Sequence, residues 1–158
     1  MINVLVNGCN GKMGQEVINQ IEADKDLLVL AGFDREDLGN TSYPVYNNIS
    51  SITVKPDVII DFSVPVATLN ILEYAKEHSI PIVIATTGFS DEQLEKLKEY
   101  SKYIPIFKSA NMSYDINLMA KLLAQIAPIL KDSDIEIIET HHNRKIDAPS
   151  GTALLLAD

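Results

Sequence analysis

The chain has 158 residues, a formal net charge of −9 and 46% hydrophobic residues, which allows one sizeable hydrophobic core and the beginning of a second. An isoelectric point near 4.7 argues against nucleic acid and anionic membranes as partners, because both require a positively charged surface. The sequence begins without a signal-peptide pattern, has no apolar run of membrane-spanning length and contains one cysteine, Cys9, so we expect a cytoplasmic protein.

Residues 2–7 form an apolar, β-branched segment that ends in glycines, and apolar residues recur at helical spacing from Lys12 onward. Further apolar segments predict strands at 27–33, 56–62, 81–86 and 103–107, and amphipathic segments predict helices at 66–78 and 91–102, with Ser90 as an N-cap. Consecutive apolar residues are typical of strands covered on both faces. The pattern therefore predicts an α/β fold with a doubly wound parallel sheet of the Rossmann type. The polar segment at roughly 35–55 is the one most expected to lack regular structure.

The pattern changes after Asn111. We expect a helix over about 113–131, which Pro128 kinks or breaks near its end, then a strand over 134–140 and a short helix from Ser150. These elements are too few to close a sheet. We therefore predict a dinucleotide-binding domain at 1–112 and, at 113–158, the beginning of a truncated α+β substrate domain.

The segment VNGCNGKMG places Gly8, Gly11 and Gly14 between the first strand and the first helix. Such a turn offers free N–H groups and a helix N-terminus to a pyrophosphate. Asp34 follows the second strand, where a carboxylate can accept hydrogen bonds from an adenosine ribose. Arg35 and Lys12 could neutralise a 2′-phosphate, so we expect NADH and NADPH to be tolerated alike.

Two other interpretations of this turn remain. The glycines could serve only close packing of strand and helix, with Asp34 and Arg35 in a solvated loop. A phosphate-binding loop of the nucleotidase type is disfavoured, because Met13, instead of Ser or Thr, follows Lys12. Cys9 is interpreted as a small packing residue.

Loops at the carboxyl ends of the later strands carry Ser63, Thr86, Thr87 and Gly88. In a doubly wound sheet such loops line the ligand crevice, which would place these residues beside a nicotinamide ring. Each of them singly is equally well explained as part of an ordinary capped turn.

The segment 139–158 concentrates cationic and helix-start residues. Ser150, Gly151 and Thr152 form a helix start that could bind a carboxylate, and Lys145 adds a positive charge. His141 and His142 titrate near neutrality and suit proton transfer. Adjacent histidines point in opposite directions on an extended chain, so we expect no metal site. The alternative is that these are solvated loop residues.

The string E-x-H-H-x-x-K-x-D-A-P-S-G-T-A, at residues 139–153, resembles the signature of the 4-hydroxy-tetrahydrodipicolinate (dihydrodipicolinate) reductase family. Further matches are V-x-G-x-x-G-x-M-G at 6–14, D-F-S at 61–63, T-T-G-F at 86–89 and S-A-N-M-S at 109–113. The resemblance implies reduction of a cyclic dicarboxylate by NADH or NADPH with loss of water, in the diaminopimelate and lysine pathway. It also implies contacts to the cofactor from Gly8, Lys12, Met13, Gly14, Asp34, Arg35, Phe62, Thr86, Gly88 and Asn111.

The resemblance assigns proton donation to His141, substrate contacts and assistance to His142 and Lys145, and a grip on a substrate carboxylate to Gly151 and Thr152. Members of the family are longer and form homotetramers, so we expect this chain to be a fragment that is weakly active or inactive. Two alternatives stay open. One is a nucleotide-binding module without catalysis. The other is a semialdehyde or homoserine dehydrogenase. The former needs a catalytic cysteine in its second domain, whereas the one cysteine of this sequence, Cys9, lies in the glycine turn.

Overall fold

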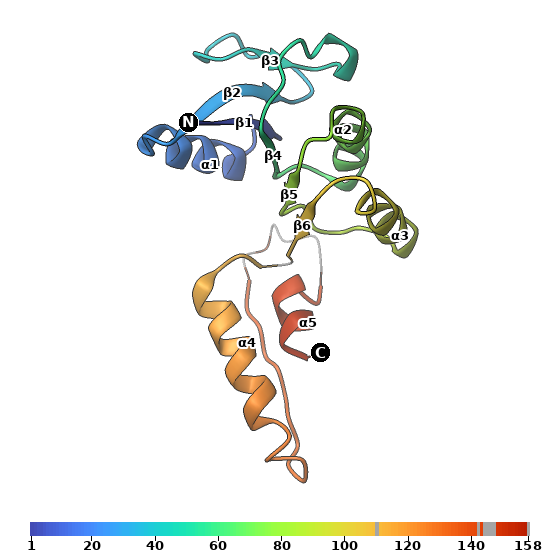
Figure 1. Cartoon of the computed structure of the whole chain (residues 1–158). Coiled ribbons are helices and arrows are strands. Elements are labelled where there is room, and N and C mark those ends of the chain that lie inside the picture. The colour runs from blue at the N-terminus through green and yellow to red at the C-terminus, as the bar shows by residue number, and fades with distance from the viewer. Residues whose placement is uncertain (110, 142, 144–147, 158) are drawn as a thin grey trace. The chain divides into compact units, whose positions relative to one another are not determined.

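The structure is a computed structural model, and it describes residues 1–109, 111–141, 143 and 148–157. The chain divides into two units, Met1–Lys108 and Ser109–Asp158. Figure 1 shows the elements of both units in chain order, and each unit is described by itself.

The first unit is built on a six-stranded sheet in which every pair of neighbouring strands is parallel. Its strands are β1 (Ile2–Asn7), β2 (Leu27–Phe33), β3 (Val45–Tyr46), β4 (Val58–Asp61), β5 (Ile82–Ile84) and β6 (Ile106–Lys108), in the order β3-β2-β1-β4-β5-β6. The chain winds outward from β1 to one edge, then crosses back to β4 and winds to the other edge. The two central strands, β1 and β4, therefore mark the point where a ligand crevice is expected.

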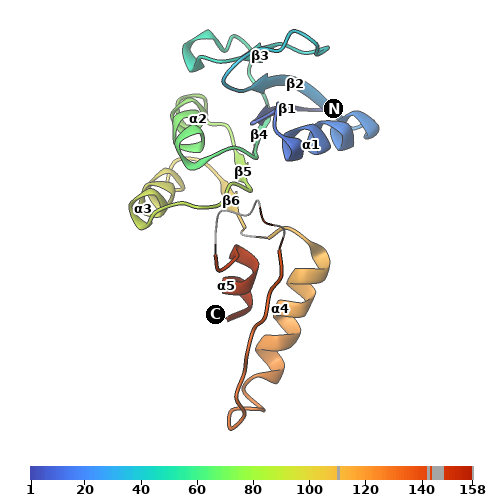
Figure 2. The same ribbon diagram turned by 180° about the vertical axis from the view of Figure 1, so that it is seen from behind.

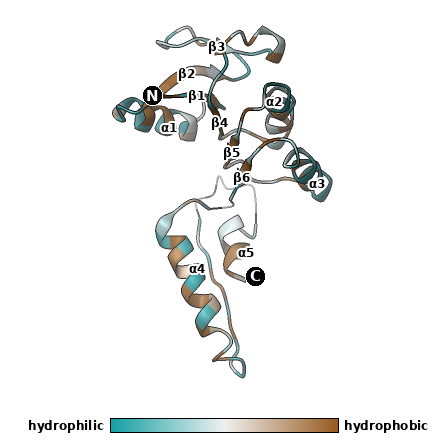
Figure 3. Cartoon of the chain, viewed as in Figure 1, coloured by the Kyte–Doolittle hydropathy of each residue, from teal (hydrophilic) through white to brown (hydrophobic). Residues whose placement is uncertain are grey.

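Helices cover both faces of this sheet. They are α1 (Lys12–Ala23), α2 (Pro65–His78) and α3 (Asp91–Tyr100). Figures 1 and 2 show α1 on one side of the sheet and α2 with α3 on the other. Alternate residues of β1 enter the two resulting cores: Val4 packs with Ile18 of α1, whereas Leu5 packs in the cluster that contains Ile71 and Leu97. The predicted α/β, doubly wound fold is confirmed, and the brown strands in Figure 3 show the apolar pattern that predicted it.

Some boundaries differ from the prediction. The strand expected at 103–107 begins only at Ile106, because residues 101–104 form turns that end α3. The prediction that 35–55 lacks regular structure was wrong in part: β3 pairs with β2 at the sheet edge, and a short 3-10 helix, η1, spans Ile49–Ser51. Ser90 caps α3 as predicted, and Gln93 completes a capping box with it.

The second unit contains α4 (Tyr114–Ile126) and α5 (Gly151–Ala157). The helix predicted over 113–131 ends at Ile126, two residues before Pro128, which has no N–H to donate to a further helical turn. Residues 127–130 continue as turns. The strand predicted at 134–140 is not formed within the described part of the chain. A strand needs a hydrogen-bonded neighbour, and the described residues supply none there. No helix among the described residues has the length and apolarity that crossing a membrane requires.

Candidate functional site

The glycine turn between β1 and α1 is packed too closely for larger side chains. The Gly8 amide donates to the carbonyl of Phe33 at 2.8 Å, and the Gly11 amide donates to the carbonyl of Gly8 at 3.0 Å. Gly8 has φ of +81°, and a Cβ there would lie 2.4 Å from the carbonyl oxygen of Phe62. A Cβ on Gly14 would lie 2.1 Å from the carbonyl oxygen of Gly8. The turn thus brings its backbone against the residue that follows β4.

The N-terminus of α1 opens onto this turn. Gly11 is its N-cap and supplies no side-chain acceptor, so the first N–H groups of the helix, which have no acceptor within it, can meet an external anion. Lys12 and Met13 are exposed at this helix start, whereas Gly14 is buried.

Asp34 stands at the end of β2 and is tied to the glycine turn. Its carboxylate accepts the Asn10 amide at 2.8 Å through Oδ2 and the Arg35 amide at 2.8 Å through Oδ1. The Asn10 side chain in turn donates to the carbonyl of Glu36 at 2.9 Å. Arg35 itself is exposed. The loops after β1 and β2 are therefore held together by a carboxylate at the position predicted to meet a ribose.

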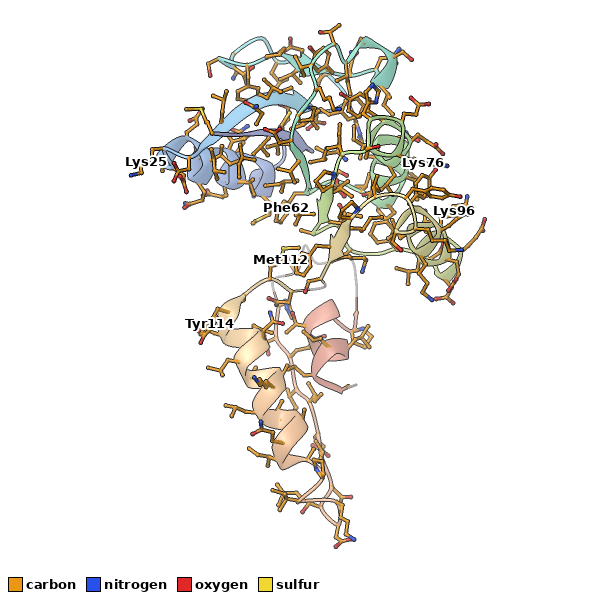
Figure 4. The ribbon with its side chains drawn as sticks, in the orientation of Figure 1. Lys25, Phe62, Lys76, Lys96, Met112 and Tyr114 are labelled. Carbon is orange, nitrogen blue, oxygen red and sulfur yellow. The ribbon has the colours of Figure 1, made fainter. Side chains whose placement is uncertain are left out.

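A pocket of about 600 Å³ opens at the carboxyl ends of β1, β2 and β4. It brings together six predicted site residues, Gly8, Gly11, Asp34, Arg35, Phe62 and Ser63. Its other lining residues are Asn7, Asn10, Phe33, Asn47, Val64, Val66, Ala67 and Asn70. Figure 4 labels Phe62 in this region, while Lys25, Lys76 and Lys96 lie along the outer helices and loops. A volume of this size is within the usual range for small-molecule and cofactor sites.

The predicted residues after β5 lie outside this pocket lining. Thr86 is 3% exposed, and its hydroxyl is engaged twice: it donates to Asp61 Oδ2 at 2.9 Å and accepts the Ser63 amide at 2.9 Å. Thr87 and Gly88 are exposed, and Gly88 has φ of +80°. Thr86 is therefore bound into the protein interior, whereas its two neighbours are accessible.

Asp61, which the sequence interpretation missed, is the most heavily hydrogen-bonded side chain near the pocket. It is fully buried at the end of β4 and accepts from Asn7 Nδ2 at 2.7 Å, Ser63 Oγ at 2.5 Å, Thr68 Oγ1 at 2.6 Å and Thr86 Oγ1 at 2.9 Å. Burial raises the pKa of Asp61 above its ordinary 3.8, while these four hydrogen bonds act in the opposite direction. An aspartate that ends an apolar strand was the signal available in the sequence.

Cys9 has the packing role that was predicted. It is fully buried, and a Cβ on Gly32 would lie 2.5 Å from its Sγ. Burial raises the pKa of the Cys9 thiol to about 11, and the nearby Asp34 charge adds to this shift. A thiol held protonated in this way is a poor nucleophile.

In the second unit, Glu139 holds the start of α5. Its carboxylate accepts the Ser150 amide at 2.8 Å through Oε1 and the Ser150 hydroxyl through Oε2. The same hydroxyl caps the helix by accepting the Ala153 amide at 3.0 Å. His141 Nδ1 lies 3.6 Å from Glu139 Oε2. Glu139 therefore links the histidine predicted to donate a proton with the helix start predicted to bind a carboxylate.

Two more predicted residues meet in this unit: Asn111 Nδ2 donates to Thr152 Oγ1 at 2.8 Å. Gly151 is the first residue of α5. His142 and Lys145 lie outside the described residues. Among the residues that the structure describes, histidine, cysteine and carboxylate side chains form no group of three that could hold a metal ion.

Comparison with known proteins bears on both units. A family model for the N-terminus of dihydrodipicolinate reductase matches residues 2–112, and a model for the C-terminus of the same enzyme matches residues 115–158. The chain belongs to the dihydrodipicolinate reductase family. The resemblance read from the motifs is thereby confirmed.

Similar members of the dihydrodipicolinate reductase family include the 4-hydroxy-tetrahydrodipicolinate reductases of Clostridium novyi (strain NT), 46% identical, and Clostridium tetani (strain Massachusetts / E88), 48% identical. Each alignment covers 100% of this chain, and 63% and 62% of the respective relatives. The chain thus spans less than two thirds of their length.

A solved structure, dipicolinate-bound dihydrodipicolinate reductase from Paenisporosarcina sp. TG-14, is 32% identical with a TM-score of 0.78. It aligns over 99% of this chain and 64% of its own. An oxidoreductase from Agrobacterium radiobacter in complex with NAD+ is only 14% identical, over 80% of this chain and 41% of its own, with a TM-score of 0.62. This second likeness concerns the fold alone.

Proposed function

We propose that the chain carries the cofactor-binding unit and part of the substrate unit of a reductase that converts 4-hydroxy-tetrahydrodipicolinate to tetrahydrodipicolinate. The observation that carries the proposal is the pocket where the glycine turn, Asp34 and Phe62 meet, in a chain whose family membership extends over both units. On this view residues 1–112 bind the cofactor, and residues 113–158 contribute to binding the substrate.

The residues around the glycine turn fit a nicotinamide dinucleotide. The turn leaves no room for a Cβ at Gly8 or Gly14, and it leads directly into α1, whose first N–H groups can meet a pyrophosphate. Asp34 would accept hydrogen bonds from the adenosine ribose, and the exposed cations of Arg35 and Lys12 would neutralise a 2′-phosphate. When bound, NADH or NADPH supplies a hydride from its nicotinamide ring.

Most of the remaining cofactor contacts are proposed for exposed or pocket-lining groups. Phe62 and Ser63 line the pocket, and Thr87 with Gly88 offers accessible backbone and hydroxyl groups after β5. The further cofactor contacts proposed are Gly11, Met13, Thr86 and Asn111.

The proposed chemistry adds one hydride and one proton to the cyclic dicarboxylate and releases one water. His141 would donate the proton, and because its Nδ1 faces Glu139, we assign the donation to Nε2. Gly151 and Thr152 would hold a substrate carboxylate, since the Ser150 amide and hydroxyl are already engaged by Glu139. His142 and Lys145 would add positive charge and assist protonation.

The cofactor half of the proposal is tested by calorimetry on the 158-residue chain with NADH and with NADPH. Binding of at least one of them at micromolar to submillimolar concentration is expected, and binding of neither would contradict the proposal. A second titration, with dipicolinate after the cofactor, examines the substrate half.

The reaction is tested in a chimera that joins residues 1–158 to the remaining segment of the Clostridium tetani relative. We expect turnover with freshly made 4-hydroxy-tetrahydrodipicolinate, and a loss of about 100-fold or more in kcat for each of H141Q and K145M. His78→Gln is the matched control, because His78 lies on α2 outside the pocket lining. Near-native rates in H141Q and K145M would remove both residues from the mechanism.

A second candidate function is a nucleotide-binding module without catalysis. It is favoured by α4, which buries none of its residues and leaves Leu118, Leu122 and Ile126 between 45% and 48% exposed. Figure 3 shows these apolar stretches as brown bands along α4. A substrate site resting on such a helix is poorly preorganised. Cofactor binding without any dipicolinate binding by the 158-residue chain would favour this candidate.

A further inference from the structure

Asp61 occupies a position in the first unit that none of the proposed contacts explains. It is fully buried at the carboxyl end of β4, so it cannot touch a ligand in the pocket. Its four donors come from four places: the end of β1, the loop after β4, helix α2 and the loop after β5. A carboxylate has about four lone-pair sites, so these four donors occupy all of the acceptor sites of Asp61.

Two of these four donors fix the loop that lines the pocket. The Ser63 hydroxyl donates to Asp61 Oδ1 at 2.5 Å. The Thr86 hydroxyl donates to Asp61 Oδ2. This orients the lone pairs of the Thr86 oxygen toward the Ser63 amide, which donates to it at 2.9 Å. Ser63 is thus held through both its side chain and its backbone, directly and by way of Thr86.

The same loop supports the glycine turn. The Phe62 amide donates to the carbonyl of Asn7 at 3.0 Å, and the Phe62 carbonyl oxygen lies 2.4 Å from the position that a Cβ of Gly8 would take. Asn7 itself donates to Asp61 Oδ1 at 2.7 Å and to Ser63 Oγ at 3.1 Å. Because these contacts join Ser63, Phe62 and Gly8 closely, a displacement of Ser63 would displace the glycine turn.

From this network we infer that Asp61 is a positioning residue that sets the geometry of the cofactor pocket by fixing Ser63 and, through it, the glycine turn. The inference rests on the proposed function, because it concerns the same cofactor site. It also gives the buried Thr86 hydroxyl a positioning role, through Asp61 and Ser63, in addition to the cofactor contact proposed for this residue.

The chain offers a matched control at the other end of the same two strands. Asp57, just before β4, accepts from the amide and from the side chain of Asn3 at 2.7 and 2.9 Å. The pair Asn3–Asp57 lies at the opposite end of β1 and β4, away from the pocket, and it is exposed, whereas the pair Asn7–Asp61 is buried. Asp57→Asn and Asp61→Asn therefore make the same chemical change at an exposed pair and at a buried one.

The test measures NADH affinity of the 158-residue chain by calorimetry in wild type, D57N, D61N and the exchange variant N7D/D61N. In D61N one carboxylate oxygen becomes an NH2 group, so the Ser63 hydroxyl or the Thr86 hydroxyl loses its acceptor, and we expect the Kd to rise about tenfold or more. D57N should bind as wild type does. The exchange variant should recover most of the affinity, because N7D supplies a new carboxylate oxygen to Ser63.

The outcomes separate the two proposals. If wild type does not bind NADH, both the proposed function and this inference are overturned. If wild type binds NADH and D61N has the same Kd as D57N, only the inference is overturned. It is also overturned if the exchange variant regains wild-type stability but binds NADH as weakly as D61N does. Should D61N not fold, T68V removes one donor to Asp61 away from the pocket. A folded T68V with an unchanged Kd would overturn the inference, and a rise of about threefold or more would support it.

Discussion

Replacing Gly14 with alanine sets two effects of opposite sign against each other. Alanine is favoured over glycine within a helix by about 1 kcal/mol, and Gly14 lies in the first turn of α1. The added Cβ, however, would lie 2.1 Å from the Gly8 carbonyl oxygen, 2.9 Å from the Gly8 carbonyl carbon and 3.0 Å from Cys9 Cα. All three atoms belong to the backbone, so no side chain can rotate away.

The clash should outweigh the helix propensity. Ordinary contacts lie at roughly 3.5 Å, so the turn and the helix must separate by about 1.4 Å, and overpacking of this kind costs about 1–3 kcal/mol. With rigid backbone on the far side we take the upper value. The net expectation for G14A is a loss of about 2 kcal/mol in the free energy of unfolding, with weaker NADH binding because Gly8 moves.

Urea unfolding followed by circular dichroism measures this change. Gly11→Ala is the control: Gly11 has φ of −72° and ψ of 160°, which any residue adopts, and the nearest atom to its Cβ lies at 3.2 Å. We expect G11A to change the free energy of unfolding by less than about 1 kcal/mol. A G14A protein more stable than wild type by about 1 kcal/mol would show that propensity prevails and would refute the packing argument.

Three further predictions concern charge, capping and pH. Arg35→Ala should weaken NADPH binding about tenfold while changing the NADH Kd by less than about twofold, as calorimetry would show; equal losses for both cofactors would contradict a role at the 2′-phosphate. Ser90→Ala should lower the free energy of unfolding by about 1 kcal/mol, because it removes the capping box of α3; unchanged stability would indicate a cap that contributes nothing. The pKa of Asp61 is raised by burial, so this group favours the folded state most below the ordinary carboxyl pKa and loses that contribution as pH rises through its folded pKa. Wild type should therefore gain stability relative to D61N as the pH falls toward 4, and a difference independent of pH would contradict this. The groups around Asp61, namely Asn7, Ser63, Thr68 and Thr86, carry no charge that could produce the same trend.

Local patterns predicted most of the first unit. The apolar segments 2–7 and 27–33 became β1 and β2 with the expected bounds, because strands buried on both faces are apolar throughout. The capping of α3 by Ser90 depends on residues three positions apart and is likewise visible in the sequence.

Features that depend on distant partners were not predicted. The two residues of β3 are a strand only because β2 lies beside them. The segment 134–140 has strand-forming residues but no partner among the described ones. Three of the four donors to Asp61 come from residues 54, 7 and 25 positions away, so the place of this aspartate at the end of an apolar strand was the signal that the sequence offered. At the site, the sequence identified residues that line the pocket and missed the one beneath them.

The two asparagine–aspartate pairs also bear on how the chain finds its correct strand alignment. Between them, β1 and β4 pair Val4 with Val58, Leu5 with Ile59 and Val6 with Ile60. A slip of two residues would keep each of these side chains on its own face, and apolar contacts alone discriminate weakly against it. Such a slip would, however, separate Asn3 from Asp57 and Asn7 from Asp61 together, leaving a buried carboxylate without its amide donor. The polar pairs at the two ends of β1 and β4 thus disfavour a slipped register that the apolar contacts between them would tolerate.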